Sequence, residues 1–241
     1  SAKRNNLRTA RAPWGACADI PMTENPRNFD NEAASWDDKP DRVKLAADIT
    51  FAIRQNVPLS TDMDVLDFGC GTGLLTLALQ PYVRFVTGVD SSRGMLAVLQ
   101  RKIDQANLAN VKTVLLDLDR GDRLSGSYDL ITSSMTLHHI PDIDALFCEF
   151  HRILKPSGLI AVADLDPDDG QFHSDNTGVY SFGFDRIMMR DKLARSGFQR
   201  ISIIDSAHRG KTLSDGSTRQ FCVFLATAQK QATGTLRRDC D

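Results

Sequence analysis

The amino-acid sequence predicts an α/β fold in which helices cover both faces of a mostly parallel sheet. Short apolar segments typical of buried strands alternate with longer segments whose apolar residues recur at helical spacing. The first strand runs into a glycine-rich turn that opens a helix, as in parallel βαβ units. A chain of 241 residues with 41% hydrophobic residues suits one domain with a full core, or one domain with a modest appendage.

The first part of the predicted domain contains two strand–helix units. Apolar spacing predicts a helix over residues 35–57, followed by a short buried strand over 63–68. A second helix begins inside the glycine segment. Residues 85–89 form the second strand, and Ser91 or Ser92 can cap the helix after it.

The middle of the chain continues the same alternation. Residues 111–116 and 128–132 read as the third and fourth strands. Asp142 can cap the next helix, and residues 155–158 form the turn that leaves it. The fifth strand covers residues 159–163.

The last part of the domain departs from the alternation. Residues 164–183 are a polar stretch, and a helix follows over 186–195. Two strands, 201–204 and 220–226, then follow one another without a helix between them. Such a pair favours a hairpin, which places an antiparallel strand at one edge of the sheet.

Three ranges divide the chain. We predict a disordered extension or leader over residues 1–28, one domain over 29–228 and a polar tail over 229–241. Five scattered cysteines without a C-x-x-C pair favour a reducing compartment and hence a cytoplasmic location. The basic residues near the N-terminus leave an organellar location as the alternative, if residues 1–21 are a native targeting segment.

Charge and hydropathy restrict the partners. A formal net charge of -2 argues against a nucleic-acid partner bound by a broad basic surface. No apolar run approaches the roughly 18 residues that a membrane helix needs. We therefore expect a small-molecule substrate, no nucleic acid and no membrane span, while the oligomeric state has no signal in the sequence.

The sharpest motif is the glycine loop after the first strand. Its glycines, Gly69, Gly71 and Gly73, follow the pattern G-x-G-x-G, whereas dinucleotide sites require G-x-G-x-x-G and would have a glycine at Leu74. Asp67 lies two residues before the first glycine. A carboxylate there gains nothing from a pyrophosphate, but it attracts an ammonium group.

Two further acids end the second and third strands. Asp90 can accept hydrogen bonds from both hydroxyls of a ribose. Asp117 can accept one from the exocyclic amine of adenine, whose ring Met95 and Leu118 can contact. All three acids fall at the carboxyl edge of the sheet, where ligands bind in open α/β folds. The ligand that these acids imply has an ammonium group, a ribose and an adenine, and S-adenosylmethionine has all three.

These motifs resemble the class I S-adenosylmethionine-dependent methyltransferases, most strongly the type-11 and ubiquinone/menaquinone C-methyltransferase-like branch. The resemblance covers about residues 29–228. It rests on the glycine loop, on Asp90, on the Asp117–Leu118 pair, on residues 128–131 and on residues 154–158, which are similar to the family's L-K-P-G-G turn with Ser157 in place of one glycine. It implies S-adenosylmethionine as cofactor, S-adenosylhomocysteine as product, and a Rossmann-like seven-stranded sheet of order 3-2-1-4-5-7-6 with strand 7 antiparallel. The candidate cofactor residues are Asp67, Gly69, Gly71, Gly73, Asp90, Ser91, Met95, Asp117, Leu118 and Ser133.

Three histidines are the catalytic candidates. His138 and His139 follow the fourth strand, where the family places the reacting methyl group, and His173 lies in the polar stretch. An imidazole there could act as a base, orient the substrate, or only shape the pocket. Adjacent histidines are poorly placed to chelate one ion, and the acids of residues 164–169 read as solvated turn residues rather than cation ligands, so no metal is predicted.

The predicted function is transfer of the methyl group of S-adenosylmethionine to a small-molecule acceptor by in-line displacement. One alternative is a nucleic-acid or protein methyltransferase on the same fold. Amino-directed nucleic-acid enzymes often carry Asn/Asp-Pro-Pro-Tyr after the fourth strand, and residues 133–136 here are Ser-Ser-Met-Thr. A second alternative is a cofactor-binding subunit without activity of its own. We also expect the helix from residue 35 to cover the cofactor from the N-terminal side, with Trp36 and Arg42 as its candidate residues; alternatively, Trp36 only packs on the core.

Overall fold

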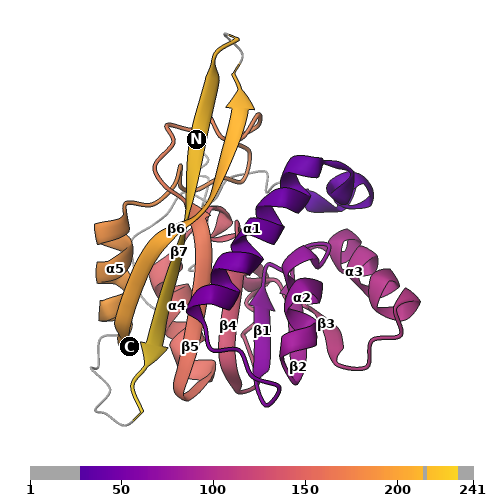
Figure 1. The fold of residues 1–241 in the computed structure, drawn as a ribbon, viewed down its shortest axis with the longest axis vertical. Helices are drawn as coiled ribbons and strands as arrows, with labels where there is room; N and C mark the ends of the chain where they lie inside the picture. Colours follow the sequence, from indigo (N-terminus) through magenta and orange to yellow (C-terminus); the bar gives the residue numbers. More distant parts are fainter. Residues whose placement is uncertain (1–27, 214–215, 233–241) are drawn as a thin grey trace, which may run out of the picture.

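A seven-stranded sheet forms the centre of the computed structural model, which describes residues 28–213 and 216–232 (Figure 1). The strand order is β3-β2-β1-β4-β5-β7-β6. All pairs are parallel except those of β7, which runs antiparallel to β5 and β6. This confirms the predicted fold class and strand order. The strands are β1 Asp64–Phe68, β2 Phe85–Asp90, β3 Val111–Leu115, β4 Tyr128–Ser134, β5 Leu154–Leu165, β6 Phe198–Thr212 and β7 Thr218–Lys230.

Helices cover both faces of this sheet. They are α1 Pro40–Asn56, α2 Leu74–Leu79, α3 Arg93–Gln105, α4 Ile143–Ile153 and α5 Arg186–Arg195, with short 3-10 turns that include Phe29–Asn31 and Ala33–Asp38. Apolar residues of α4 and α5 share one buried cluster with the sheet, and those of α1 and α2 share another. In the part of the chain that is described, no helix has the length and apolar character needed to cross a membrane.

Several boundaries differ from those predicted. α1 begins at Pro40 instead of residue 35, because proline suits the first turn of a helix and residues 33–38 form a 3-10 turn. Residues 155–158, predicted as a turn, belong to β5, where Ser157 has φ +63° and the pairing register shifts. β4 continues two residues beyond the predicted end, to Ser134.

The β6–β7 hairpin is much longer than predicted. β5 pairs with β7 only as far as Leu165 opposite Val223, so the segments 208–212 and 218–222 pair with each other alone. This part of the hairpin projects past the rest of the sheet, beside α1 (Figure 1). At the other end, β7 reaches Lys230, so residues 229 and 230 are strand residues and not part of a tail. The predicted extension, apart from Asn28, lies outside the described residues.

Candidate active site

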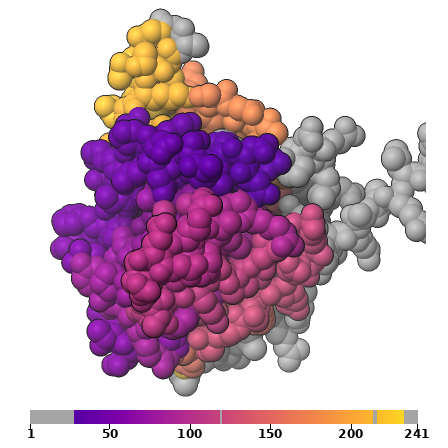
Figure 2. Space-filling view, turned by 90° about the vertical axis from the view of Figure 1, so that its right-hand side faces the viewer, coloured from indigo at the N-terminus to yellow at the C-terminus, as the bar shows by residue number. Residues whose placement is uncertain are grey.

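A cavity of about 480 Å³ opens at the carboxyl ends of the central strands. Its size falls within the range of about 300–1,000 Å³ that small-molecule sites occupy. The walls come from the glycine loop, the segment after β4, the loop after β5, the N-terminal segment with α1, and β6. Figure 2 shows the indigo N-terminal segment and α1 crossing the molecule between the magenta body and the yellow hairpin.

The glycine loop turns back on itself at the end of β1. Gly69 and Gly71 line the cavity. Their φ angles, +70° and +54°, lie in the left-handed region that residues other than glycine avoid. The amide of Gly71 donates to Oδ2 of Asp90 at 2.8 Å. Gly73 lies outside the cavity lining and instead precedes α2, where a Cβ would meet Leu99 at 2.2 Å. Gly73 therefore allows α2 to pack closely against α3.

Asp67 is a buried carboxylate at the floor of the cavity. It accepts hydrogen bonds from Oγ1 of Thr76 at 2.5 Å and Oγ1 of Thr132 at 3.0 Å. Burial raises the pKa of Asp67 to about 6, and repulsion by Asp90 adds to the effect, while the threonine hydroxyls oppose it. A cation at this position would compensate the buried charge, so the ammonium group predicted for the ligand fits this site.

The other predicted cofactor residues surround the glycine loop. Asp90, Ser91, Met95, Asp117 and Leu118 all line the cavity. Burial raises the pKa of Asp90 despite hydrogen bonds from backbone amides, including that of Ser92 at 2.8 Å. Oδ2 of Asp117 lies 3.1 Å from Nε of Arg120. Two acids and two apolar side chains therefore face the space where the ribose and adenine were predicted.

The predicted contact from Ser133 is not found in the cavity lining. Ser133 is fully buried, and its neighbour Ser134 lines the cavity instead. The two serines differ because β4 extends through both of them, and successive side chains of a strand point to opposite faces.

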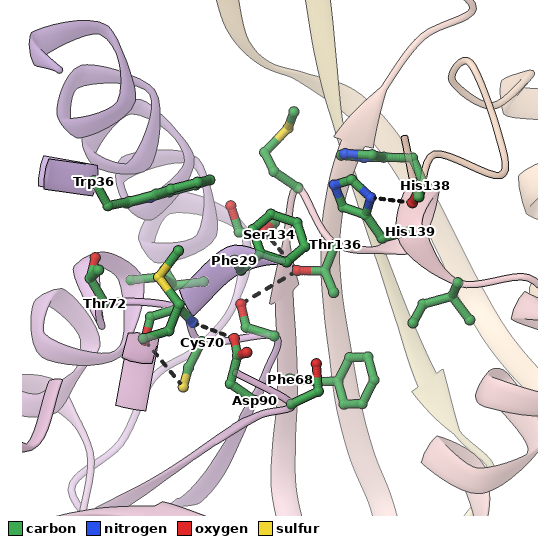
Figure 3. A pocket seen from close by; sticks show the side chains of 18 of the residues that line it. Phe29, Trp36, Phe68, Cys70, Thr72, Asp90, Ser134, Thr136, His138 and His139 are labelled. Atoms are coloured by element: carbon green, nitrogen blue, oxygen red, sulfur yellow. Dashed lines mark hydrogen bonds between the residues drawn. The ribbon is translucent and has the colours of Figure 1, made fainter. Parts of the chain in front are cut away.

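The N-terminal segment forms a cover over the glycine loop. Phe29 and Trp36 line the cavity and contact each other edge to face, with ring centroids 6.0 Å apart (Figure 3). Asp30 holds the segment to the start of α3, since its Oδ1 accepts from Oγ of Ser92 at 2.5 Å and from the amide of Gly94 at 2.7 Å. Trp36 was expected here from the sequence, whereas Phe29 and Asp30 were not.

A buried histidine–aspartate pair lies across the cavity. Nδ1 of His138 is 2.7 Å from Oδ1 of Asp164, and both side chains are buried. Burial raises the pKa of Asp164, but the charge of His138 and hydrogen bonds from His138 and from backbone amides outweigh this effect and hold the pKa below its ordinary value. An ionised carboxylate only accepts hydrogen bonds, so Nδ1 carries a proton. Among the described residues, Nε2 of His138 is buried without a hydrogen-bond partner.

The three predicted histidines come together. The ring centroids of His138 and His139 are 4.2 Å apart, and that of His173 lies 4.9 Å from His138 and 5.7 Å from His139. Nδ1 of His139 is 2.7 Å from the carbonyl oxygen of Gly178, on the loop after β5. One ligand atom from each histidine lies within 4.8 Å of the others. The spacing of His138 and His139 argued against a shared ion, but with His173 they form a group that could hold one.

Of the acids of residues 164–169, which were predicted to be solvated, Asp169 is exposed and the other three are not. Asp164 and Asp168 are buried. Asp168 accepts hydrogen bonds from the amides of Gly170 and Phe172, and Asp166 pairs with Arg186 at 2.7 Å. These acids therefore organise the loop that carries His173.

Comparisons with known proteins agree with this geometry. Residues 65–158 match a family model described as a methyltransferase domain. The chain is 34% identical over 140 residues to an uncharacterized methyltransferase of Schizosaccharomyces pombe, covering 55% of this chain and 49% of that one. It is 31% identical over 190 residues to a malonyl-[acyl-carrier protein] O-methyltransferase of Methylovorus, covering 71% and 62%.

The fold is shared with solved structures at lower identity. A SAM-dependent methyltransferase from Aquifex aeolicus superimposes with a TM-score of 0.61 at 19% identity, covering 83% of this chain and 97% of that one. This likeness supports the fold. The chain spans about half to three fifths of the length of the two curated relatives described above.

Proposed function

We propose that this chain, which belongs to the class I S-adenosylmethionine-dependent methyltransferases, transfers a methyl group to a small molecule that loses a proton in the reaction. The observation that carries the proposal is one cavity with two chemically different parts. Asp67 and the glycine loop line one part, and His138, whose Nε2 is buried, lines another. The first part suits the cofactor, and the second suits the acceptor.

The cofactor supplies an electrophilic methyl group on a positively charged sulfur. Asp67 binds its ammonium group, Asp90 its ribose, and Asp117 with Leu118 its adenine. Phe29 and Trp36 exclude water from the same space, since they line the cavity from the N-terminal cover. A dry site with aligned reactants accounts for much of the rate of such a displacement.

His138 serves as the general base in this proposal. The nucleophilic atom of the acceptor gives its proton to Nε2 of His138 as the bond to the methyl group forms. Asp164 keeps the proton of the ring on Nδ1 and stabilises the imidazolium that results. His139 and His173 border the same space and orient the acceptor. A hydroxyl or an acidic C–H is the kind of nucleophile that needs such a base.

The size and the walls of the cavity support a small acceptor. The N-terminal segment and α1 form one wall and the loop after β5 another, and the space that they border is about 480 Å³. The O-methyltransferase name of the Methylovorus relative is consistent with an oxygen nucleophile.

The test is a methyl-transfer assay that follows S-adenosylhomocysteine formation over a panel of hydroxylated small molecules. For an acceptor that the wild type methylates, His138→Gln and Asp164→Asn should lower kcat by about 10²-fold or more. Both variants should still bind S-adenosylhomocysteine with the wild-type Kd. Unchanged kcat in both variants would refute the role of His138 as the base.

A further inference from the structure

The cavity continues past the histidines toward α1 and the projecting hairpin. Phe172, from the loop after β5, and Arg209, from β6, line this far end together with Arg42 of α1. Phe172 contacts His173 edge to face, with ring centroids 5.0 Å apart, and Cζ of Arg209 lies 5.1 Å from the centroid of Phe172. The guanidinium of Arg209 is therefore separated from the histidine cluster by one aromatic ring.

Arg209 is a half-buried cation with little compensation. Its side chain is 24% exposed, and among the described residues its closest carboxylate oxygen, on the mostly exposed Asp41, is 4.0 Å away. Within the part of the chain that is described, Nε of Arg209 is buried and donates no hydrogen bond. Burial lowers the pKa of Arg209, Asp41 opposes this and Arg42 adds to it by repulsion. Arg186 shows the usual arrangement, with two hydrogen bonds to Asp166 at 2.7 and 2.8 Å.

The neighbouring charges do not neutralise Arg209. Arg42 is already paired with Glu32 at 2.9 Å and stacked on Trp36, with Cζ 3.5 Å from the ring centroid. Lys211 also lines the cavity, and its Nζ donates to backbone carbonyls at 3.1 and 3.0 Å. The carboxylate of Asp175, a further lining residue, accepts from Thr177.

The acids of the strand ends and the two cations of β6 therefore line different parts of the cavity. The acids of the strand ends surround the space of the cofactor, and Arg209 and Lys211 lie at the far end. We propose that the methyl acceptor carries an anionic group, a carboxylate or a phosphate, which binds the guanidinium of Arg209. A planar guanidinium binds either oxyanion through paired hydrogen bonds, and the free Nε–H of Arg209 supplies one of them.

This arrangement determines the direction in which the acceptor lies. Its anionic group contacts Arg209, an apolar middle lies against the ring of Phe172, and its nucleophilic atom faces His138. The methylated atom is then distinct from the anionic group, so the product keeps its negative charge. The inference rests on the proposed function, because it assigns the acceptor of the same site.

The experiment compares matched compounds. Hydroxylated aromatic and aliphatic acids, for example 4-hydroxybenzoate, are each tested beside the neutral amide and the corresponding phosphate monoester. The wild type, Arg209→Gln and Arg209→Lys are assayed for methyl transfer, and for binding of each compound in the presence of S-adenosylhomocysteine. Arg219→Gln is the control. Arg219 belongs to the same hairpin as Arg209 and lies over the ring of Phe221, but it is outside the cavity lining.

The wild type should prefer the anionic compounds over the amides by about tenfold or more in kcat/KM, as expected for a charge-assisted hydrogen bond. Whether the acid or the phosphate series is preferred identifies the anion. Arg209→Gln should abolish the preference through KM, Arg209→Lys should keep part of it, and Arg219→Gln should keep all of it. Arg209→Gln should unfold at the wild-type temperature or higher, since a poorly compensated buried charge is removed.

The results separate failure of this inference from failure of the proposed function. Amides that bind and react as well as the acids, or an acid preference that survives in Arg209→Gln, would overturn the anionic acceptor. The same conclusion follows if the wild type binds S-adenosylhomocysteine but binds and methylates no anionic compound of the panel. A wild type that binds neither S-adenosylmethionine nor S-adenosylhomocysteine would instead remove the proposed function.

Discussion

Replacement of Asp67 by asparagine should stabilise the cofactor-free protein and at the same time weaken cofactor binding. The carboxyl of Asp67 is buried, and burial raises its pKa from 3.8 to about 6. A difference of about 2 pKa units corresponds to about 3 kcal/mol. An asparagine would keep the shape of the side chain, and the hydroxyls of Thr76 and Thr132 can accept as well as donate hydrogen bonds.

The pH dependence follows from the direction of the shift. Between pH 3.8 and about 6 the folded protein holds a proton on Asp67 that the unfolded chain has released. The contribution of Asp67 to the free energy of unfolding therefore falls as the pH rises through this window, by about 1.4 kcal/mol per pH unit, and is constant above it. Asp67→Asn should be as stable as the wild type near pH 4 and more stable by up to about 3 kcal/mol at pH 8.

Urea denaturation of both proteins from pH 4 to pH 8 measures this difference, and calorimetric titration measures the binding. The wild type should bind S-adenosylmethionine about tenfold more weakly at pH 5 than at pH 7.5, because a pKa of about 6 leaves about a tenth of Asp67 ionised at pH 5. The asparagine variant should bind weakly at both pH values. A stability difference that does not change with pH, or an asparagine variant with wild-type affinity, would refute the role assigned to Asp67.

Three further predictions concern the glycine loop and the histidines. Gly69→Ala should unfold at a lower temperature than the wild type and lose cofactor binding, because its Cβ would lie 2.3 Å from Thr136. In Gly71→Ala the Cβ has nothing within 4 Å, so this variant should lose only the roughly 1–2 kcal/mol that a left-handed backbone costs. Thermal unfolding compares the two variants, and equal losses of stability would contradict the clash. His138→Ala should make kcat respond to added imidazole, which can replace the missing base, and kcat without such rescue would count against proton transfer at this position. Treatment with EDTA should leave kcat unchanged, because the base requires no metal; loss of activity that zinc restores would show that the three histidines hold an ion.

The cofactor half of the site was predictable because its residues are positioned by local features. Asp67, Asp90 and Asp117 each fall where a buried apolar segment ends, and parallel strands bring such ends to one edge of the sheet. The conformation of Gly69 and Gly71 follows from the tight turn between β1 and α2. These features require only the strand boundaries, which were correct to within a residue or two for β1 and β2.

The acceptor half depends on tertiary contacts that short-range patterns do not encode. The sequence pattern indicates a turn acid at Asp164 because it ends β5 at residue 163, but the strand continues to Leu165 and buries Asp164 against His138. The full length of the hairpin has no clear signal, because most residues of β6 beyond Ile204 are polar and half-buried or exposed, as in a loop. The sequence therefore does not indicate that Arg209 belongs to the site.

The cover of the cofactor space was missed for a similar reason. Asp30 contacts Ser92 and Gly94, which lie more than sixty residues later in the chain. Nothing in the residues around Asp30 indicates which helix it will cap, because capping by a distant carboxylate has no fixed spacing. Trp36 was identified only because it lies at the start of the first predicted helix.

The most direct test of the cofactor site is a calorimetric titration of the wild type and Asp90→Ala with S-adenosylmethionine, S-adenosylhomocysteine and NADH. Asp90 is the strand-end carboxylate that should bind the ribose, and it also accepts a hydrogen bond from Gly71 at 2.8 Å. The wild type should bind both S-adenosyl ligands and not NADH, and Asp90→Ala should bind them at least about tenfold more weakly, as for loss of a charge-assisted hydrogen bond. A folded wild type that binds neither S-adenosyl ligand would contradict the methyltransferase site.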